Sequence, residues 1–283
     1  MKKSFLFIVS TAMLLFSACC GRTDAPADTI KVLSYNIRVV HGQDGPNSWE
    51  FRKEATPAMI LANDPDILGV QEACPEQIRY IRETCPHYAS VGLGRNEARP
   101  GLGERPELFW NTERVQMLDW GVFWLSETPD EISRGWDAMY NRVATWGLFE
   151  HLATGKRFIS VNTHLDHIGV EARKQSLGVI RQEIAKINKE NLPWTLTGDF
   201  NMGDDSEAIV NFRKEMNDSR VTAVKTDNLD SFNLFGEAEP GIKIDFVFYD
   251  GFSSCLEFRT IQEQYAGKPY ISDHYPVVST LQF

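Results

Sequence analysis

The sequence predicts an α/β fold in which two packed, mostly antiparallel β-sheets are flanked by helices. Three observations carry this prediction. Apolar segments of strand length recur along the chain, two longer segments have the pattern of hairpins, and amphipathic helical segments lie between them. Hairpins that alternate with helices favour two packed sheets with helices on the outside.

Strands are predicted where β-branched and aromatic residues gather in short runs. "IKVLSYNI" opens this series, and "DILGVQE" is a shorter, buried example. The predicted single strands cover residues 30–37, 66–72, 192–200, 242–250 and 275–283.

Two longer segments are predicted to be hairpins. Residues 107–126 would turn at Asn111–Glu113, and residues 141–165 would turn at Thr154–Lys156. Both have strand-like residues on each side of a short polar stretch.

Helices are predicted at 49–63, where Pro57 disturbs the middle, at 75–84 and at 170–190. The last has the clearest pattern, because one face carries Leu177, Ile180, Ile184 and Ile187. Residues 94–107 are rich in glycine, proline and charge, which favours a mobile loop near a site.

The N-terminal stretch "MKKSFLFIVSTAMLLFSACCGR" has the shape of a secretory signal, with two lysines, an apolar run and small residues before Cys19. We therefore expect a signal peptide at 1–19, a tether at 20–29 and one domain at 30–283. Because "FSAC" resembles a bacterial lipoprotein box, Cys19 is the expected lipidation site, and an ordinary cleaved signal is the alternative. The expected location is the periplasm or the outer membrane as a lipoprotein, or otherwise the medium as a secreted protein.

The charge balance argues against a protein that holds nucleic acid tightly. Removal of Lys2 and Lys3 with the signal leaves 27 basic and 39 acidic side chains, a net charge of −12. A negative surface does not attract polyanions, so we expect no stable nucleic-acid complex. We also expect a monomer that touches a membrane only through its lipid anchor.

Polar residues stand at the ends of the predicted strands, which is the main functional signal of the sequence. Taken singly they have simpler interpretations: Glu72 could be a helix cap, His164 a structural histidine, and "GDFN" a turn. Together they offer oxygen ligands for Mg²⁺ and imidazoles for proton transfer. The set consists of Asn36, Glu72, His164, Asp199, Asn201, Asp245, Asp273 and His274.

The motifs "GDFN" and "SDHYPV", with "QE" upstream, resemble those of the endonuclease/exonuclease/phosphatase superfamily over about residues 30–283. The resemblance implies a four-layered α/β sandwich and a metal-dependent hydrolase of phosphate esters. It also implies a Mg²⁺ cofactor, with Mn²⁺ as a substitute.

The resemblance assigns roles to the matching residues. The metal ligands would be Glu72, Asn36 and Asp273. Asp199 would position the attacking water, and Asn201 would hold the phosphate or the water. His274, oriented by Asp245, and His164 would contact the phosphoryl group. Whether Asp199 or His274 takes the proton is left open.

Two further residues are weaker candidates. The segment "GERPELFWNTERVQMLD" aligns Glu104 with the acid partner of His164, although a loop glutamate in water is an equal alternative. Arg142, before "VATW", is a candidate phosphate contact, with a surface arginine as the alternative.

The resemblance implies a phosphate-ester substrate. The sequence favours some classes of ester over others but does not identify the substrate. The resemblance favours a phosphodiesterase, either a nuclease or a lipid-headgroup enzyme of the sphingomyelinase kind. A phosphomonoesterase acting on a sugar or inositol phosphate is the alternative. The 5-phosphatase branch is disfavoured, because "GDFNMGDD" and "GIKIDFVF" lack its motifs. A non-catalytic binding module of the same fold is the other alternative.

Overall fold

A computed structural model describes residues 28–97 and 103–283. The expected signal peptide, Cys19 and most of the expected tether lie outside these residues. Within them, none of the helices has the length and apolar character needed to cross a membrane.

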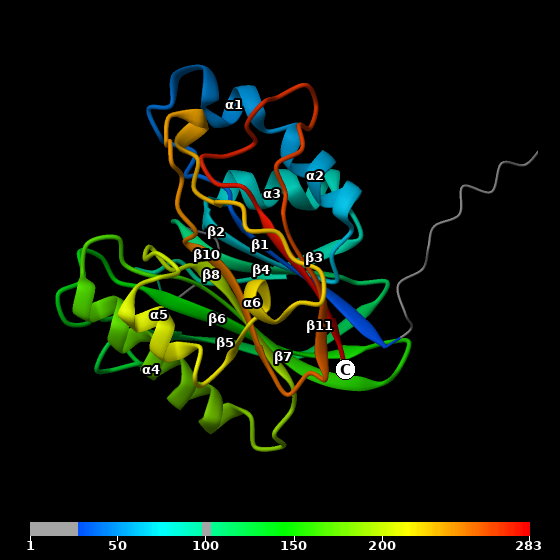
Figure 1. The fold of residues 1–283 in the computed structure, drawn as a ribbon, viewed down its shortest axis with the longest axis vertical. Helices are drawn as coiled ribbons and strands as arrows, with labels where there is room; N and C mark the ends of the chain where they lie inside the picture. Colours follow the sequence, from blue (N-terminus) through cyan, green and yellow to red (C-terminus); the bar gives the residue numbers. More distant parts are fainter. Residues whose placement is uncertain (1–27, 98–102) are drawn as a thin grey trace, which may run out of the picture.

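The described strands form two six-stranded sheets that pack face to face (Figure 1). In spatial order, the first sheet consists of β11 (Ser254–Thr260), β12 (Val277–Gln282), β1 (Thr29–Asn36), β2 (Ile67–Ala73), β4 (Arg105–Asn111) and β3 (Tyr88–Val91). The second consists of β5 (Val115–Trp124), β6 (Val143–His151), β7 (Lys156–His164), β8 (Trp194–Asp199), β10 (Asp245–Asp250) and β9 (Asn217–Asp218).

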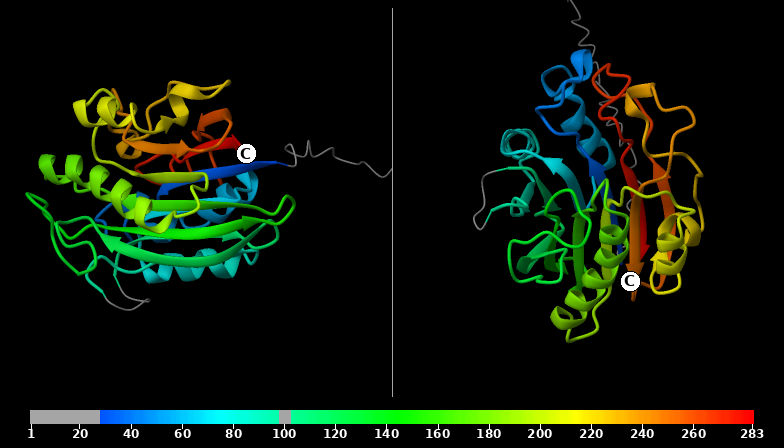
Figure 2. Two further views of the ribbon diagram at one scale, coloured as in Figure 1. Left: turned by 90° about the horizontal axis from the view of Figure 1, so that it is seen from below. Right: turned by 90° about the vertical axis from the view of Figure 1, so that its left-hand side faces the viewer.

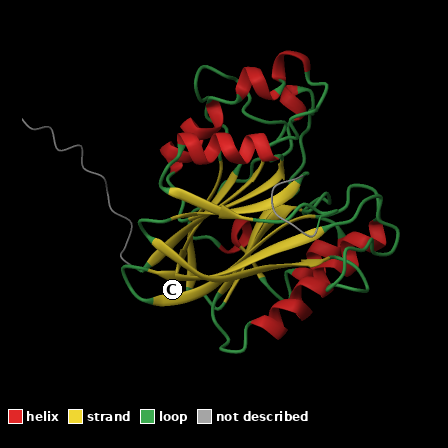
Figure 3. Ribbon diagram, turned by 180° about the vertical axis from the view of Figure 1, so that it is seen from behind, coloured by secondary structure: helices red, strands yellow, loops and turns green. Residues whose placement is uncertain are grey.

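Both sheets are mixed. The pairs β1–β2 and β7–β8 are parallel, and the other pairs are antiparallel. Helices cover the outer faces, as Figures 2 and 3 show from other directions, so the predicted four-layered sandwich is confirmed. These helices are α1 (Trp49–Arg52), α2 (Ala55–Asn63), α3 (Pro75–Thr84), α4 (Val170–Ile187) and α5 (Glu207–Phe212), whereas α6 (Ser219–Thr222) packs against β10 of one sheet and β11 of the other.

Three apolar clusters follow from this layering. One joins the first sheet to α1, α2 and α3, and another joins the second sheet to α4 and α5. The third lies between the sheets and includes Val32 and Leu108 from the first sheet with Phe158 and Val247 from the second. Both faces of each sheet are therefore buried in the middle of the molecule.

One predicted hairpin is correct and the other is wrong. β6 and β7 pair as expected across the turn before Lys156. Residues 107–126 form no hairpin, because β4 pairs with β2 and β3 while β5 pairs with β6 in the other sheet. The segment Thr112–Arg114 thus carries the chain from one sheet to the other.

The predicted helix at 49–63 is divided in two. α1 ends at Arg52 and α2 begins at Ala55, which places Pro57 in the first turn of α2, where its missing N–H leaves no hydrogen bond unmade. The helix predicted at 170–190 ends at Ile187. Leu177, Ile180 and Ile184 are buried as expected.

A buried polar network holds the two sheets in register beneath the strand ends. The Asn162 amide of β7 donates to the carbonyl oxygens of Val70 (3.0 Å) and Glu107 (2.9 Å) in the first sheet. Its Oδ1 accepts from Gln71 Nε2 (2.7 Å) and Thr197 Oγ1 (3.1 Å). All four hydrogen-bonding positions of this amide are therefore used.

Candidate active site

The first sheet brings two of the predicted metal ligands together through its parallel pair. Because β1 and β2 run in the same direction, with Asn36 opposite Gln71, their carboxyl ends lie at one edge of the sheet. Asn36 is the last residue of β1, and Glu72 lies one residue before the end of β2. The amide of Asn36 donates to Glu72 Oε1 at 3.3 Å.

The second sheet places three predicted residues at the facing edge. His164 ends β7 opposite Asp199, which ends the parallel strand β8. β10 is antiparallel to β8, so its first residue, Asp245, also lies opposite Asp199. The two edges meet where Asn36 Nδ2 donates to Asp199 Oδ2 at 2.9 Å.

Asp273 and His274 join this group from the segment before β12. Backbone hydrogen bonds hold that segment: Asn233 N and Leu234 N donate to the Asp273 carbonyl, at 2.8 and 3.0 Å. Because residues 272–276 are not part of a regular strand, the two neighbouring side chains need not point to opposite faces. Both are buried at the site.

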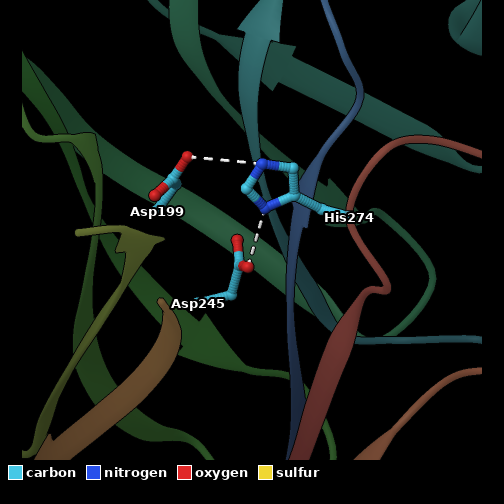
Figure 4. A group of neighbouring side chains, drawn as sticks. All are labelled: Asp199, Asp245 and His274. Atoms are coloured by element: carbon cyan, nitrogen blue, oxygen red, sulfur yellow. Dashed lines mark hydrogen bonds and ion pairs between the residues drawn. The ribbon is translucent and has the colours of Figure 1, made fainter. Parts of the chain in front are cut away.

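The imidazole of His274 lies between two carboxylates (Figure 4). Its Nδ1 donates to Asp245 Oδ2 at 2.8 Å, the contact that the family resemblance implies, and its Nε2 lies 3.7 Å from Asp199 Oδ2. Burial alone would lower the pKa of His274, but the charges of Asp245 and Asp199 raise it to about 10. The geometry therefore favours a protonated imidazolium with Nε2–H directed toward the site.

Asp199 is the most central carboxylate. Its Oδ1 accepts from Asn201 N at 2.8 Å and its Oδ2 from Asn36. Burial, assisted by the charge of Asp245, raises the pKa of Asp199 to about 7, against the opposing effect of His274. A carboxylate of this kind can accept a proton near neutral pH.

His164 lies on the other side of Asp199, with Nε2 at 3.5 Å from Asp199 Oδ2. The Asn201 amide donates to His164 Nε2 (2.9 Å), which places the proton of a neutral ring on Nδ1. Burial and the charges of Arg142 and Arg95 lower the pKa of His164 well below its usual value. Nδ1 is buried and has no hydrogen-bond partner among the described residues.

The Glu104 carboxylate lies close to His164 but makes no hydrogen bond to it. Its Oε1 lies 3.8 Å from His164 Nδ1, and Arg95 holds both carboxylate oxygens at 3.0 Å. Glu104 thus lies at the site rather than in open water. Residues 98–102 of the predicted loop lie outside the described residues.

Arg142 is buried, so the surface-arginine alternative is wrong. Its Nε donates to Asp166 Oδ2 at 3.3 Å, and its Nη2 donates to His167 Nδ1 at 3.2 Å. The predicted phosphate contact stays a prediction. What the structure does place there is a fixed positive charge near His164.

The carboxylates of Glu72 and Asp273 form the oxygen-rich side of the site. Glu72 Oε2 accepts from Val39 N at 2.8 Å, and Ser272 Oγ lies 3.1 Å from Asp273 Oδ1. Burial, with the charge of Glu72, raises the pKa of Asp273, although the His274 charge opposes this. Two such oxygen donors fit a hard divalent cation such as Mg²⁺.

Asn36 is predicted to be a third metal ligand, but its side chain makes hydrogen bonds to neighbouring groups instead. Its Oδ1 accepts from Arg38 N at 3.0 Å, while its nitrogen faces Glu72 and Asp199. In this arrangement Asn36 links the two carboxylates, and coordination by its oxygen would need the amide to turn over.

Asp199, Asp245 and His274 also have donor atoms within 4.8 Å of one another, a spacing that a metal ion could use. Nδ1 of His274 is already bonded to Asp245, and Mg²⁺ prefers oxygen ligands. We therefore interpret this group as a hydrogen bond and an ion pair that share His274, and not as the expected Mg²⁺ site.

Sequence reasoning missed two arginines at the site. Arg38 Nη1 lies 3.5 Å from Asp273 Oδ2, and Arg95 holds Glu104. The position of Arg38 two residues after Asn36 is the one local signal that could have pointed to it.

The chain is similar to known proteins along most of its length. A model of the Endonuclease/Exonuclease/phosphatase family matches residues 33–274. A solved structure of an endonuclease/exonuclease/phosphatase from Bacteroides vulgatus is 35% identical, with a TM-score of 0.84, covering 90% of this chain and 99% of the other. A mannosyl-6-phosphatase from Bacteroides thetaiotaomicron is 31% identical, with the same TM-score, covering 90% and 100%.

Curated nucleases match a smaller part. The 3′–5′ exoribonuclease subunit Ccr4 of the CCR4-Not complex from Emericella nidulans is 28% identical over 199 residues. The match covers 59% of this chain and 29% of that subunit, so the chain spans less than a third of its length.

Proposed function

Because the chain belongs to the endonuclease/exonuclease/phosphatase family, we propose that it is a Mg²⁺-dependent hydrolase of phosphate esters. One observation carries the proposal: two carboxylates, those of Glu72 and Asp273, lie beside His274, which is hydrogen-bonded to Asp245 and ion-paired with Asp199. A binding module of the same fold would have no need of this buried and electrostatically strained arrangement.

The metal would be held by Glu72 and Asp273, with Mn²⁺ able to replace Mg²⁺. When bound, the cation would neutralise phosphate charge and help to orient the ester. The rest of the chemistry belongs to side chains that the fold holds in place.

Asp199 acts as the residue that orients the attacking water and accepts its proton. Both of its oxygens are fixed, by Asn201 N and Asn36 Nδ2, which leaves its remaining lone pairs directed into the site. His274 is poorly suited to this role: against the lowering effect of burial, the charges of Asp245 and Asp199 raise its pKa to about 10, so both ring nitrogens carry protons near neutral pH. Its Nε2–H instead stabilises negative charge on the phosphoryl oxygens.

His164 lines the opposite side of the site. Its Nε2 faces Asn201 and Asp199, while its buried Nδ1 lies toward Glu104 Oε1. Arg142 and Arg95 add positive charge behind it, and this favours an anionic substrate.

The preferred substrate class is a sugar phosphomonoester. The similarity to the mannosyl-6-phosphatase extends over the whole of that chain, and this similarity supports the choice. The phosphodiesterase favoured by the sequence is the second candidate, supported by the partial match to the exoribonuclease subunit.

A substrate panel tests the proposal. The protein is assayed with Mg²⁺ and with EDTA on mannose 6-phosphate, inositol phosphates, bis-p-nitrophenyl phosphate, RNA and sphingomyelin. We expect metal-dependent hydrolysis, strongest on the sugar phosphate. Glu72→Gln should abolish most activity and weaken Mg²⁺ binding in calorimetry, whereas Glu113→Gln at an exposed site should change neither. Hydrolysis of no member of the panel would refute the proposal.

A further inference from the structure

Arg38 has a backbone position that the surrounding residues fix closely. Its φ of +60° lies in the left-handed region, which is unfavourable for an arginine. Its N–H donates to Asn36 Oδ1, and its carbonyl accepts from Gln77 Nε2 (2.9 Å) and Arg52 Nη2 (3.1 Å). Such a conformation persists because several contacts impose it, and it aims the side chain in one direction.

The guanidinium of Arg38 is hydrogen-bonded through two of its nitrogens, and the third nitrogen faces Asp273. Nε and Nη2 donate to the two oxygens of Asp44 at 3.1 and 2.9 Å, a bidentate pair. The remaining nitrogen, Nη1, lies 3.5 Å from Asp273 Oδ2, beyond a good hydrogen bond. Asp44 therefore holds a permanent cation beside the proposed metal ligands, and within the described residues Nη1 makes an ion pair with Asp273 but no hydrogen bond.

A fixed cation at this position matters for the kind of ester that binds. A phosphomonoester carries close to two negative charges at neutral pH, with three terminal oxygens. A diester carries one charge and has two terminal oxygens, because a second organic group is bonded to the third. An arginine that meets the third oxygen would favour the monoester.

We propose that Arg38, positioned by Asp44, binds a terminal phosphate oxygen and selects phosphomonoesters over phosphodiesters. This inference rests on the proposed function. It assigns Asp44 as a positioning residue that acts through Arg38. The alternative is a purely structural role, in which Arg38 only balances the charges of Glu72 and Asp273. In that case its removal would not change the affinity for phosphate.

The test uses Arg38→Met, Asp44→Asn and the double variant. Arg157→Met, which alters an exposed pair with Glu190, is the matched control. Three quantities are measured for each protein: the Kd of Mg²⁺ alone, the Kd of inorganic phosphate at saturating Mg²⁺, and kcat/KM. The last is measured for p-nitrophenyl phosphate and for bis-p-nitrophenyl phosphate.

We expect Arg38→Met to weaken phosphate binding by about 10- to 100-fold, the effect of one charge-assisted hydrogen bond. The kcat/KM for the monoester should fall by a similar factor and that for the diester by less than about threefold. Mg²⁺ should bind as well as before or better, since a neighbouring cation is gone. Asp44→Asn should show a smaller loss of the same kind, and the double variant should be no worse than Arg38→Met.

Two results would overturn the inference, and they are distinguishable. If Arg38→Met keeps the wild-type phosphate Kd and monoester-to-diester ratio in an active enzyme, Arg38 only balances charge. If the wild-type protein neither binds phosphate with Mg²⁺ nor hydrolyses either ester, the proposed function itself fails and the inference with it.

Discussion

Replacing Asn162 with leucine should destabilise the protein far more than its single amide suggests. The side chain makes four buried hydrogen bonds, three of them to the other sheet. Each contributes about 0.5–1.5 kcal/mol, so Asn162→Leu should lower the free energy of unfolding by about 2–6 kcal/mol. A domain of ordinary stability has only about 5–15 kcal/mol in total.

Urea denaturation followed by circular dichroism measures this loss as a shift of the midpoint at unchanged m-value. Asn211→Leu, on the exposed side of α5, is the control and should change stability little. Because Asn162 links the sheets beneath both halves of the site, activity on the best substrate should also fall under conditions where the variant is folded. A loss below about 1 kcal/mol would show that the network does not hold the sheets together.

The remaining predictions concern the site, the sheet contact and the N-terminus. His274→Ala and Asp245→Ala should each reduce turnover by on the order of 10²-fold, and the double variant should be little worse than His274→Ala; losses that multiply fully would contradict the pairing. Gly69→Ala should be strongly destabilising in a thermal melt, because its Cβ would lie 2.2 Å from Thr197 Oγ1, and a wild-type Tm would refute this. Globomycin, or Cys19→Ala, should leave an unprocessed precursor on a gel if Cys19 is the proposed lipidation site, and normal processing would favour an ordinary signal.

The positions of the site residues were predictable because strand ends have a local signature. An apolar run that stops at an acid, amide or imidazole marks a buried strand reaching a polar edge, as at Asn36, His164 and Asp199. The hydrogen bond between His274 and Asp245 was predictable only through the family resemblance, because 29 residues separate them.

The partner of a strand was less predictable than the strand itself. The hydrophobic pattern across residues 107–126 shows which side chains are buried. The same side chains would be buried whether β5 paired with β4 or joined the other sheet, so the pattern does not identify the partner strand. The short strands β3 and β9 and the half-buried β11 lack a strong pattern and were not predicted. The side chains of Arg38 and Arg95 depend on distant carboxylates, which no local pattern shows.

The place of Asp273 and His274 in the chain has a consequence for biosynthesis. They are the last site residues in chain order, and the strand that follows them, β12, must insert between β1 and β11. A chain that has folded only as far as Asp199 therefore still lacks the His274 imidazole and the proposed second metal ligand, Asp273. Under the proposed function, such a chain would not hydrolyse phosphate esters, even if its earlier strands were already in place.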